Sequence, residues 1–176
     1  LQFVISIAFI ICAIFLKKQH SYMMNYDMGF NKECLLTANI PVSSMDERDA
    51  FSSELLNNPN IKEVAWSQDR MVADSRMTWG RNHHGEQMML TVMPVSWNFL
   101  QVMGIEVVEG RDFLPSDEKG DGAIILNEYA KKKYNLNLEE VINWNGKPFP
   151  ATGFCRDFHF KPLHEESDAF AFYIYD

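Results

Sequence analysis

The chain has 176 residues, about the length of one domain, and its 24 acidic against 16 basic side chains give a formal net charge of −8. Hydrophobic residues make up 47% of the chain, which is enough for a packed core and excludes disorder as a description of the whole. The negative charge argues against a nucleic-acid-binding protein, and three cysteines are too few for a disulfide-stabilised mini-protein.

The first sixteen residues, LQFVISIAFIICAIFL, are apolar on every helical face, and none of them is charged. As a helix they would be about 24 Å long, somewhat less than a hydrocarbon core of about 30 Å. Lys17 and Lys18 follow, with side chains long enough to reach lipid headgroups. We predict a transmembrane helix over residues 1–18, cut short at its start. A secretory signal peptide and a buried helix or strand of a soluble fold are the alternatives.

The other elements are predicted from hydrophobic periodicity and turn residues. The expected helices cover residues 17–33 (ending near Gly29), 45–58, 97–103 and 128–134. The expected strands cover residues 33–41, 61–66, 87–95, 105–108, 123–126, 141–144, 149–155 and 169–175. Residues 67–84 are polar and are expected to be irregular. This irregular alternation of short strands and helices predicts an α+β domain with a mixed sheet, not a doubly wound parallel sheet.

Polar residues mark the ends of several elements. Ser43 or Ser44 is expected to cap the helix over 45–58, and Asn127 the helix over 128–134. The sequence Asn145-Gly146-Lys147-Pro148 predicts a hairpin turn between two strands.

The chain carries no recognisable catalytic motif. It has no phosphate-binding glycine loop, no dinucleotide-binding GxGxxG and no nucleophile elbow GxSxG. We therefore expect it to be no enzyme, with no catalytic residue and no cofactor of its own.

Two groups of histidines are candidate metal ligands. His83 and His84 are adjacent, so they cannot share a helix face. The second group lies in the motif DFHFKPLHE and comprises Asp157, His159, His164 and Glu165. Alternation along a strand would put the first two on one side, as half a metal site, but polar groups that satisfy a turn are the favoured interpretation. We expect no metal site.

The three cysteines lie far apart in the sequence. Cys12 belongs to the apolar segment, whereas Cys34 and Cys155 fall in expected strands. The last two could pair in an oxidising compartment if their Cα atoms came within about 7 Å, but isolated cysteines are more commonly free thiols.

A series of short motifs, taken in order, resembles one protein family. The motifs are Gly29-Phe30-Asn31, Pro59-Asn60-Ile61, Val95-Ser96-Trp97, Met103-Gly104-Ile105, Glu109-Gly110-Arg111-Asp112-Phe113, Ile124-Ile125-Leu126-Asn127-Glu128, Gly153-Phe154 and Asp157-Phe158-His159-Phe160. The series resembles the extracytoplasmic core domain of MacB-like (FtsX-like) ABC transporter permeases, in the form common in Bacteroidota. It spans nearly the whole chain. Its weight lies in the order and spacing of the motifs, because each one alone is weak.

The residues that carry the resemblance are expected to determine the fold and not to catalyse. They are Gly104, Gly110, Arg111, Phe113, Asn127, Gly153, Asp157, Phe158 and His159. Gly104 and Gly110 bracket a short expected strand, where tight turns need positive φ. Arg111 next to Asp112 is expected to hold a loop through charge-assisted hydrogen bonds, and the two phenylalanines to fill the core.

The resemblance implies a transmembrane helix followed by a periplasmic domain, residues 19–176. Its porter-like part would cover about residues 19–66 and 150–176, and an inserted smaller lobe about residues 67–149. The chain would end before the family's returning porter segment and before three further transmembrane helices. The family places Lys17 and Lys18 outside the cytoplasm, against the positive-inside trend.

The implied protein is a permease subunit of the bacterial inner membrane that pairs with a second permease. A cytoplasmic ATP-binding cassette subunit hydrolyses ATP, and the helices carry the motion to the periplasm, for export or to activate a periplasmic adaptor or other partner. Two other functions remain open. One is a membrane-anchored extracytoplasmic sensor that binds a small ligand. The other is a secreted metal-dependent enzyme that uses Asp157, His159 and His164.

Overall fold

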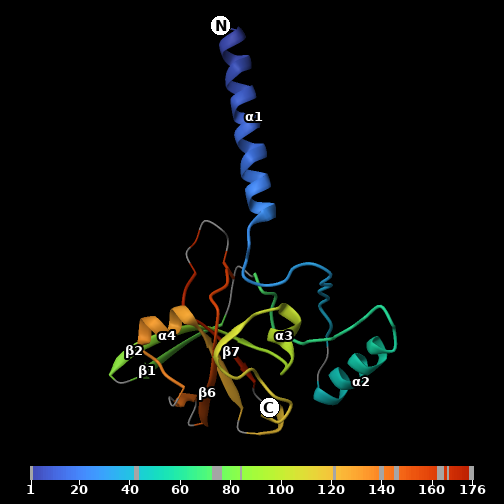
Figure 1. Ribbon diagram of the computed structural model, residues 1–176, viewed down its shortest axis with the longest axis vertical. Helices are drawn as coiled ribbons and strands as arrows, with labels where there is room; N and C mark the ends of the chain where they lie inside the picture. Colours follow the sequence, from blue (N-terminus) through green and yellow to red (C-terminus); the bar gives the residue numbers. More distant parts are fainter. Residues whose placement is uncertain are drawn as a thin grey trace.

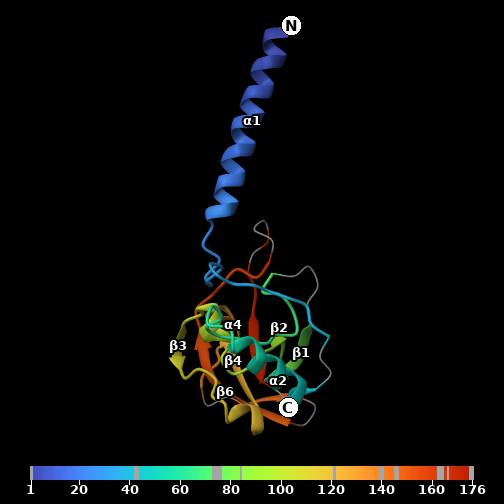
Figure 2. The same cartoon turned by 90° about the vertical axis from the view of Figure 1, so that its right-hand side faces the viewer.

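A long helix stands away from a mixed-sheet domain in the computed structural model (Figures 1 and 2). The structure describes residues 2–41, 44–72, 77–83, 85–120, 122–138, 141–144, 147–161, 165 and 167–174. The predicted α+β class is confirmed, because helices and a sheet with both parallel and antiparallel pairs occur together.

Helix α1 (Gln2–Asn25) is continuous and has no buried residue. Its apolar side chains face outward all round, with Phe3 84% and Phe9 72% exposed, so no described residue of the domain covers them. Within the described residues it is the one helix that is long and apolar enough to cross a membrane. The two helices expected over residues 1–33 are therefore one, and it ends at Asn25, before Gly29. A buried helix of a soluble fold, one of the alternatives, is not observed.

Within the described residues the sheet has seven strands, six of them in the order β1-β2-β7-β4-β6-β3, and β5 pairs with β6. Their bounds are β1 (Thr78–His83), β2 (Glu86–Pro94), β3 (Val107–Gly110), β4 (Ala123–Asn127), β5 (Val141–Trp144), β6 (Lys147–Cys155) and β7 (Phe170–Ile174). The pairs β2–β7 and β4–β6 are parallel, and the other four pairs are antiparallel. The last strand in sequence, β7, thus lies in the middle of the sheet.

In the part of the chain that the structure describes, three short helices and a 3-10 turn complete the domain: α2 (Met45–Leu56), α3 (Phe99–Met103), α4 (Glu128–Tyr134) and η1 (Asp117–Lys119). Two predicted caps are present, and Ser43, the alternative to Ser44, lies outside the described residues. The Ser44 side chain accepts a hydrogen bond from the Glu47 amide at 3.2 Å, and Asn127 Oδ1 accepts one from the Ala130 amide at 3.1 Å.

The core lies on both faces of the sheet. Successive residues of β4 and β7 are all buried, so their side chains fill both faces in turn, which explains their continuous apolar sequences. Ile125 and Phe172 belong to the cluster that α3 covers. Leu126 and Tyr173 belong to the cluster on the other face, which α4 helps to close.

The strand–helix–strand unit expected before residue 67 is wrong. Residues 33–41 and 61–66 form no strand, and next to them Ser67 makes only an isolated bridge with Val95. Leu36 is 94% exposed, so its apolar character reflects no burial. Strand β1, by contrast, arises within the polar segment expected to be irregular, because it pairs with β2 along its whole length. Alternation of apolar and polar residues does not show which segments pair with another strand.

Candidate functional site at the helix–domain junction

The chain that leaves α1 is held against the domain by backbone hydrogen bonds. The His159 amide donates to the Met28 carbonyl at 2.7 Å, and the Asn31 amide donates to the Met103 carbonyl at 2.6 Å. We call residues 26–32, 103–104 and 157–159 the junction. Three motifs that are far apart in the sequence meet in it, and they connect the long helix to the sheet domain (Figure 1).

Within the junction, the backbone at Gly29 lies close against the backbone of Asp157 and Phe158. Its φ is +78°, and a Cβ there would lie 3.0 Å from both the carbonyl oxygen of Asp157 and the Cα of Phe158. Its amide donates to Asp27 Oδ1 at 2.9 Å, which fixes the turn. Any side chain at this position would push the exit segment away from the domain.

Lys32 ties the last turn of α1 to the junction. Its Nζ donates to the carbonyl oxygens of Met24 at 3.0 Å and of Tyr26 at 3.1 Å. Carbonyls at a helix C-terminus lack helical partners and carry partial negative charge, so a cation there is favourable. The helix end is therefore held by the chain that follows it.

Aromatic rings continue the connection from the helix into the domain. Tyr26 packs edge-on against Tyr22 of α1 and against His159, each with ring centroids 5.7 Å apart. The His159 ring nitrogen Nδ1 lies 3.2 Å from Ser167 Oγ.

Asp157 and Phe158 pass the connection on to the domain interior. Asp157 Oδ1 accepts a hydrogen bond from the Tyr129 amide of α4 at 2.8 Å. Phe158 is buried, and its ring centroid is 5.1 Å from that of Phe170 and 5.3 Å from that of Phe172, both in the central strand β7. Phe158 thus connects the exit segment to the middle of the sheet through direct ring contacts.

The sequence motifs identified part of the junction and missed the rest. Gly104 ends α3 with a φ of 66°, and Asn31 lies next to it. Tyr26 and Lys32 belong to no motif of the resemblance, although Lys32 follows closely after Gly29-Phe30-Asn31 and could have been noted as a basic residue near a helix end.

A second group of signature residues holds the end of β3 against β6. Gly110 has a φ of +77°, and a Cβ there would overlap the Thr152 carbonyl and lie 2.9 Å from the Cα of Gly153. A Cβ at Gly153 would in turn lie 2.6 Å from the Arg111 carbonyl oxygen. The two backbones pack in contact because neither glycine has a side chain.

Arg111 holds the following loop mainly through Asp117. Its Nη1 and Nη2 donate to Asp117 Oδ2 at 2.7 Å and Oδ1 at 3.0 Å, and Nη1 also donates to the Asp112 carbonyl. Burial alone would raise the pKa of Asp117, but hydrogen bonds from Arg111 and the Leu114 amide, with the charge of Arg111, outweigh it and lower that pKa. Burial raises the pKa of Asp112, whose carboxylate accepts from the Phe113 amide and not from the guanidinium.

Two further signature residues are buried in the domain. Phe113 is in the core cluster on the α3 side. The Asn127 side chain makes three hydrogen bonds: it accepts from the Ala130 and Phe170 amides and donates to the Asp168 carbonyl. It thereby joins α4 to the start of β7.

The described residues contain no group of three or more metal-ligating side chains. Residues 156–160 do not form a strand, so the alternation expected for Asp157 and His159 does not apply, and their side chains have the different partners given above. His84 and His164 lie outside the described residues, as does the side chain of His83.

The cysteines are free thiols. Cys34 is exposed in a turn with a φ of 57°, whereas Cys155 is buried in β6, where burial raises the pKa of its thiol well above the ordinary value. The Cys34–Cys155 disulfide that was considered is not formed.

Comparison with known proteins adds a match over nearly the whole chain. A family model described as the MacB-like periplasmic core domain matches residues 4–175. Among solved structures, the chain is similar to the extracellular domain of the noncanonic ABC-type transporter YknZ from Gram-positive bacteria (20% identity, TM-score 0.41, covering 57% of this chain and 50% of that one). It is also similar to the periplasmic region of MacB from Actinobacillus actinomycetemcomitans (16% identity, TM-score 0.48, covering 73% and 60%).

The chain therefore spans between half and three-fifths of these two structures. A comparison with curated proteins finds no match.

Proposed function

The chain belongs to the family of MacB-like periplasmic core domains, the extracytoplasmic domains of MacB-like ABC transporter permeases, and we propose that it converts ATP hydrolysis in the cytoplasm into movement outside the membrane. In this proposal α1 spans the bacterial inner membrane, the sheet domain faces the periplasm, and the permease pairs with a second copy. ATP is hydrolysed by a separate cytoplasmic ATP-binding cassette subunit or domain. The movement serves export, or the activation of a periplasmic adaptor or partner.

The observation that carries this proposal is the junction. Coupling requires that a shift of the membrane helix moves the domain instead of being absorbed by a flexible linker. Lys32 holds the last turn of α1, and the Met28 and Asn31 backbone hydrogen bonds hold the exit segment to the domain. The segment between the helix and the sheet domain is therefore short, and hydrogen bonds attach it both to the end of α1 and to the domain.

The polar C-terminal end of α1 is also suited to coupling the membrane helix to the domain. Residues 17–25 continue the helix beyond the apolar segment, over about 13 Å at 1.5 Å per residue. They would keep the domain off the lipid surface while transmitting tilt or translation as a rigid body.

The finer expectations remain part of the proposal. The division into a porter-like part and an inserted lobe at about residues 67–149 is one of them. Strand β7 of the porter-like part pairs with β2 and β4 of the lobe, so the two parts would share one sheet. The Bacteroidota form of the family is another, and it rests on the motif series alone.

The test uses the full-length permease with its ATP-binding subunit in lipid nanodiscs. Spin labels are placed at Val108→Cys, an exposed position on β3, in a background with Cys12 and Cys34 replaced by serine. We expect the label–label distance between paired permeases to change between the nucleotide-free and ATP-bound states. Inserting four Gly-Ser residues after Asn25 should abolish this change while ATP hydrolysis continues.

The matched control places the same insertion between β1 and β2, away from the junction, and should leave the distance change intact. If nucleotide has no effect on the unmodified protein, or if the insertion after Asn25 has none, coupling through the junction is refuted. A sensor domain, the alternative function, predicts the first of these results.

A further inference from the structure

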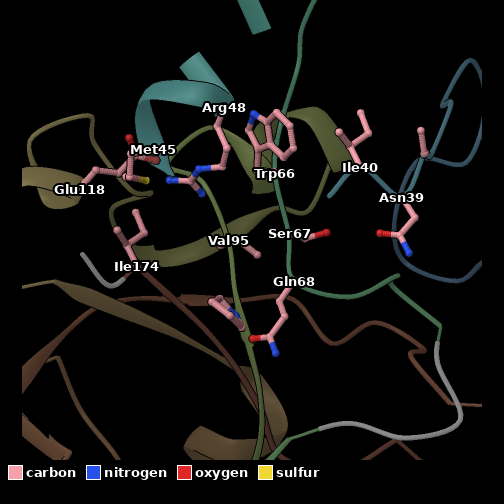
Figure 3. A pocket seen from close by; sticks show the side chains of 12 residues that line it. Asn39, Ile40, Met45, Arg48, Trp66, Ser67, Gln68, Val95, Glu118 and Ile174 are labelled. Carbon is pink, nitrogen blue, oxygen red and sulfur yellow. The ribbon is translucent and has the colours of Figure 1, made fainter. Parts of the chain in front are cut away.

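A pocket of about 340 Å³ lies between α2 and the rim of the sheet (Figure 3). Its walls come from residues 38–40, from α2, from residues 66–68, from the ends of β2 and β7, and from η1. The volume is in the range of pockets that bind small ligands. The pocket shares no residue with the junction.

The pocket has an apolar part and a polar part, and the polar part includes Asn39, Ser67, Gln68 and Glu118 beside one cation, Arg48. Met45, Val95 and Ile174 line it together with the indole of Trp66. Arg48 of α2 extends its guanidinium into the same space (Figure 3). Arg48 is partly buried, and its guanidinium makes no hydrogen bond or ion pair within the part of the chain that the structure describes. A partly desolvated cation beside apolar surface favours an anionic partner.

Two polar contacts hold the walls in place. Trp66 Nε1 donates to Ser52 Oγ at 2.8 Å, and the ring packs edge-on against Phe51 at 6.2 Å between centroids. Glu118 Oε1 accepts a hydrogen bond from the Trp97 amide at 3.0 Å. The indole and the carboxylate are thus positioned before any ligand arrives, which lowers the entropy cost of binding.

The charge of Glu118 narrows the ligand class. A carboxylate in the lining repels every anion, and it repels a multiply charged anion such as phosphate more strongly than a single carboxylate. It can accept a hydrogen bond from a ligand N–H. The complement of the pocket is therefore a single carboxylate with an apolar group and an adjacent N–H donor.

We propose that this pocket binds the free carboxyl terminus of a peptide that ends in an apolar residue. Arg48 pairs with the terminal carboxylate, the apolar wall takes the last side chain, and Glu118 accepts the amide N–H. This site is independent of the coupling proposed above, because it requires neither ATP nor a second permease.

The test measures binding of the peptide Ala-Ala-Ala-Leu to the purified chain in detergent, from the indole N–H resonance of Trp66, identified by its loss in Trp66→Phe. We expect saturable binding that weakens at least tenfold when the peptide is C-terminally amidated or when Arg48 is changed to Gln. Arg48→Lys should recover part of the affinity, because it keeps the charge. Arg156→Gln, which removes an exposed arginine elsewhere, should leave binding unchanged.

Circular dichroism of each variant excludes loss of fold as the cause. Octanoate and inorganic phosphate are the competing ligands, and we expect both to bind at least tenfold more weakly than the peptide acid. The proposal is overturned if acid and amide bind equally, if Arg48→Gln has no effect, or if no binding occurs at millimolar peptide. Octanoate that binds as tightly as the peptide would overturn the peptide assignment in favour of a fatty acid.

Discussion

At the scale of single residues, close approach of two backbones leaves no room for a side chain at Gly110. Its positive φ is unfavourable for any L side chain, and the β6 backbone occupies the place where a Cβ would be. Gly85 shares the first constraint with a φ of +86°, but nothing lies within 4 Å of its Cβ position. Comparing substitutions at the two glycines therefore distinguishes the cost of backbone strain from the cost of steric overlap.

We expect Gly110→Ala to lower the free energy of unfolding by about 3 kcal/mol, because strain and overlap add. Gly85→Ala should cost only about 1 kcal/mol, since strain acts there alone. Chemical denaturation of both variants, followed by circular dichroism of the domain, measures the difference. Equal losses would mean that β3 moves away from β6 at no cost.

At the scale of elements, ion pairs and caps attach the loops and helices to the sheet. The pair Arg111–Asp117 holds the loop after β3, and the Asp117 side chain is only 12% exposed. The pair Arg156–Glu106 has side chains 61% and 58% exposed, so solvent screens it almost completely. Only the first pair is expected to contribute measurably to stability.

We expect Asp117→Asn to lower the free energy of unfolding by about 1 kcal/mol at neutral pH. The folded pKa of Asp117 lies below its ordinary value of 3.8, so its contribution is present above that pH and is lost as pH falls through the lowered pKa. The stability difference between wild type and Asp117→Asn should therefore shrink towards zero in acid.

The measurement is the free energy of unfolding of both proteins from pH 7 to pH 2. Asp112, whose raised pKa acts in the opposite direction, is present in both proteins. Glu106→Gln is the matched control and should show no pH-dependent difference. A constant difference down to pH 2 would show that Asp117 acts through shape and not through charge.

At the scale of the whole molecule, α1 requires an environment that the domain does not provide. Its residues are exposed on all sides, and transfer of this apolar surface into lipid is favourable. The same argument predicts what a charge in the span would do.

We expect Ile7→Asp or Ile11→Asp to abolish membrane insertion, since an aspartate near the centre of a span costs roughly 3 kcal/mol. The measurement is the distribution of the chain between membrane and soluble fractions. Gln19→Asp, on the polar end of the same helix, is the control and should remain with the membrane. If the Ile7 and Ile11 variants still fractionate with membranes through this segment, the span assignment is wrong.

Local patterns were sufficient for much of the fold. Continuous apolar sequence predicts β4 and β7, and capping residues predict the starts of two helices at Ser43 or Ser44 and at Asn127. The hairpin of β5 and β6 is also predicted, but Lys147 and Pro148, expected in its turn, belong to β6, and Asn145 and Gly146 lie outside the described residues. These signals depend on residues a few positions apart, which is the range over which hydrophobic periodicity and capping act. The apolar sequence that predicts a membrane helix at α1 is likewise a local signal.

Tertiary structure alone decided which strands pair and which motifs meet. Strand β1 forms in a polar segment because β2 offers it a partner, and residues 61–66 form none despite their alternation. The junction unites Gly29, Gly104 and Phe158, whose separation along the chain hides their contact. Such long-range contacts depend on which surfaces remain available when the chain packs, and no short window of sequence contains that information.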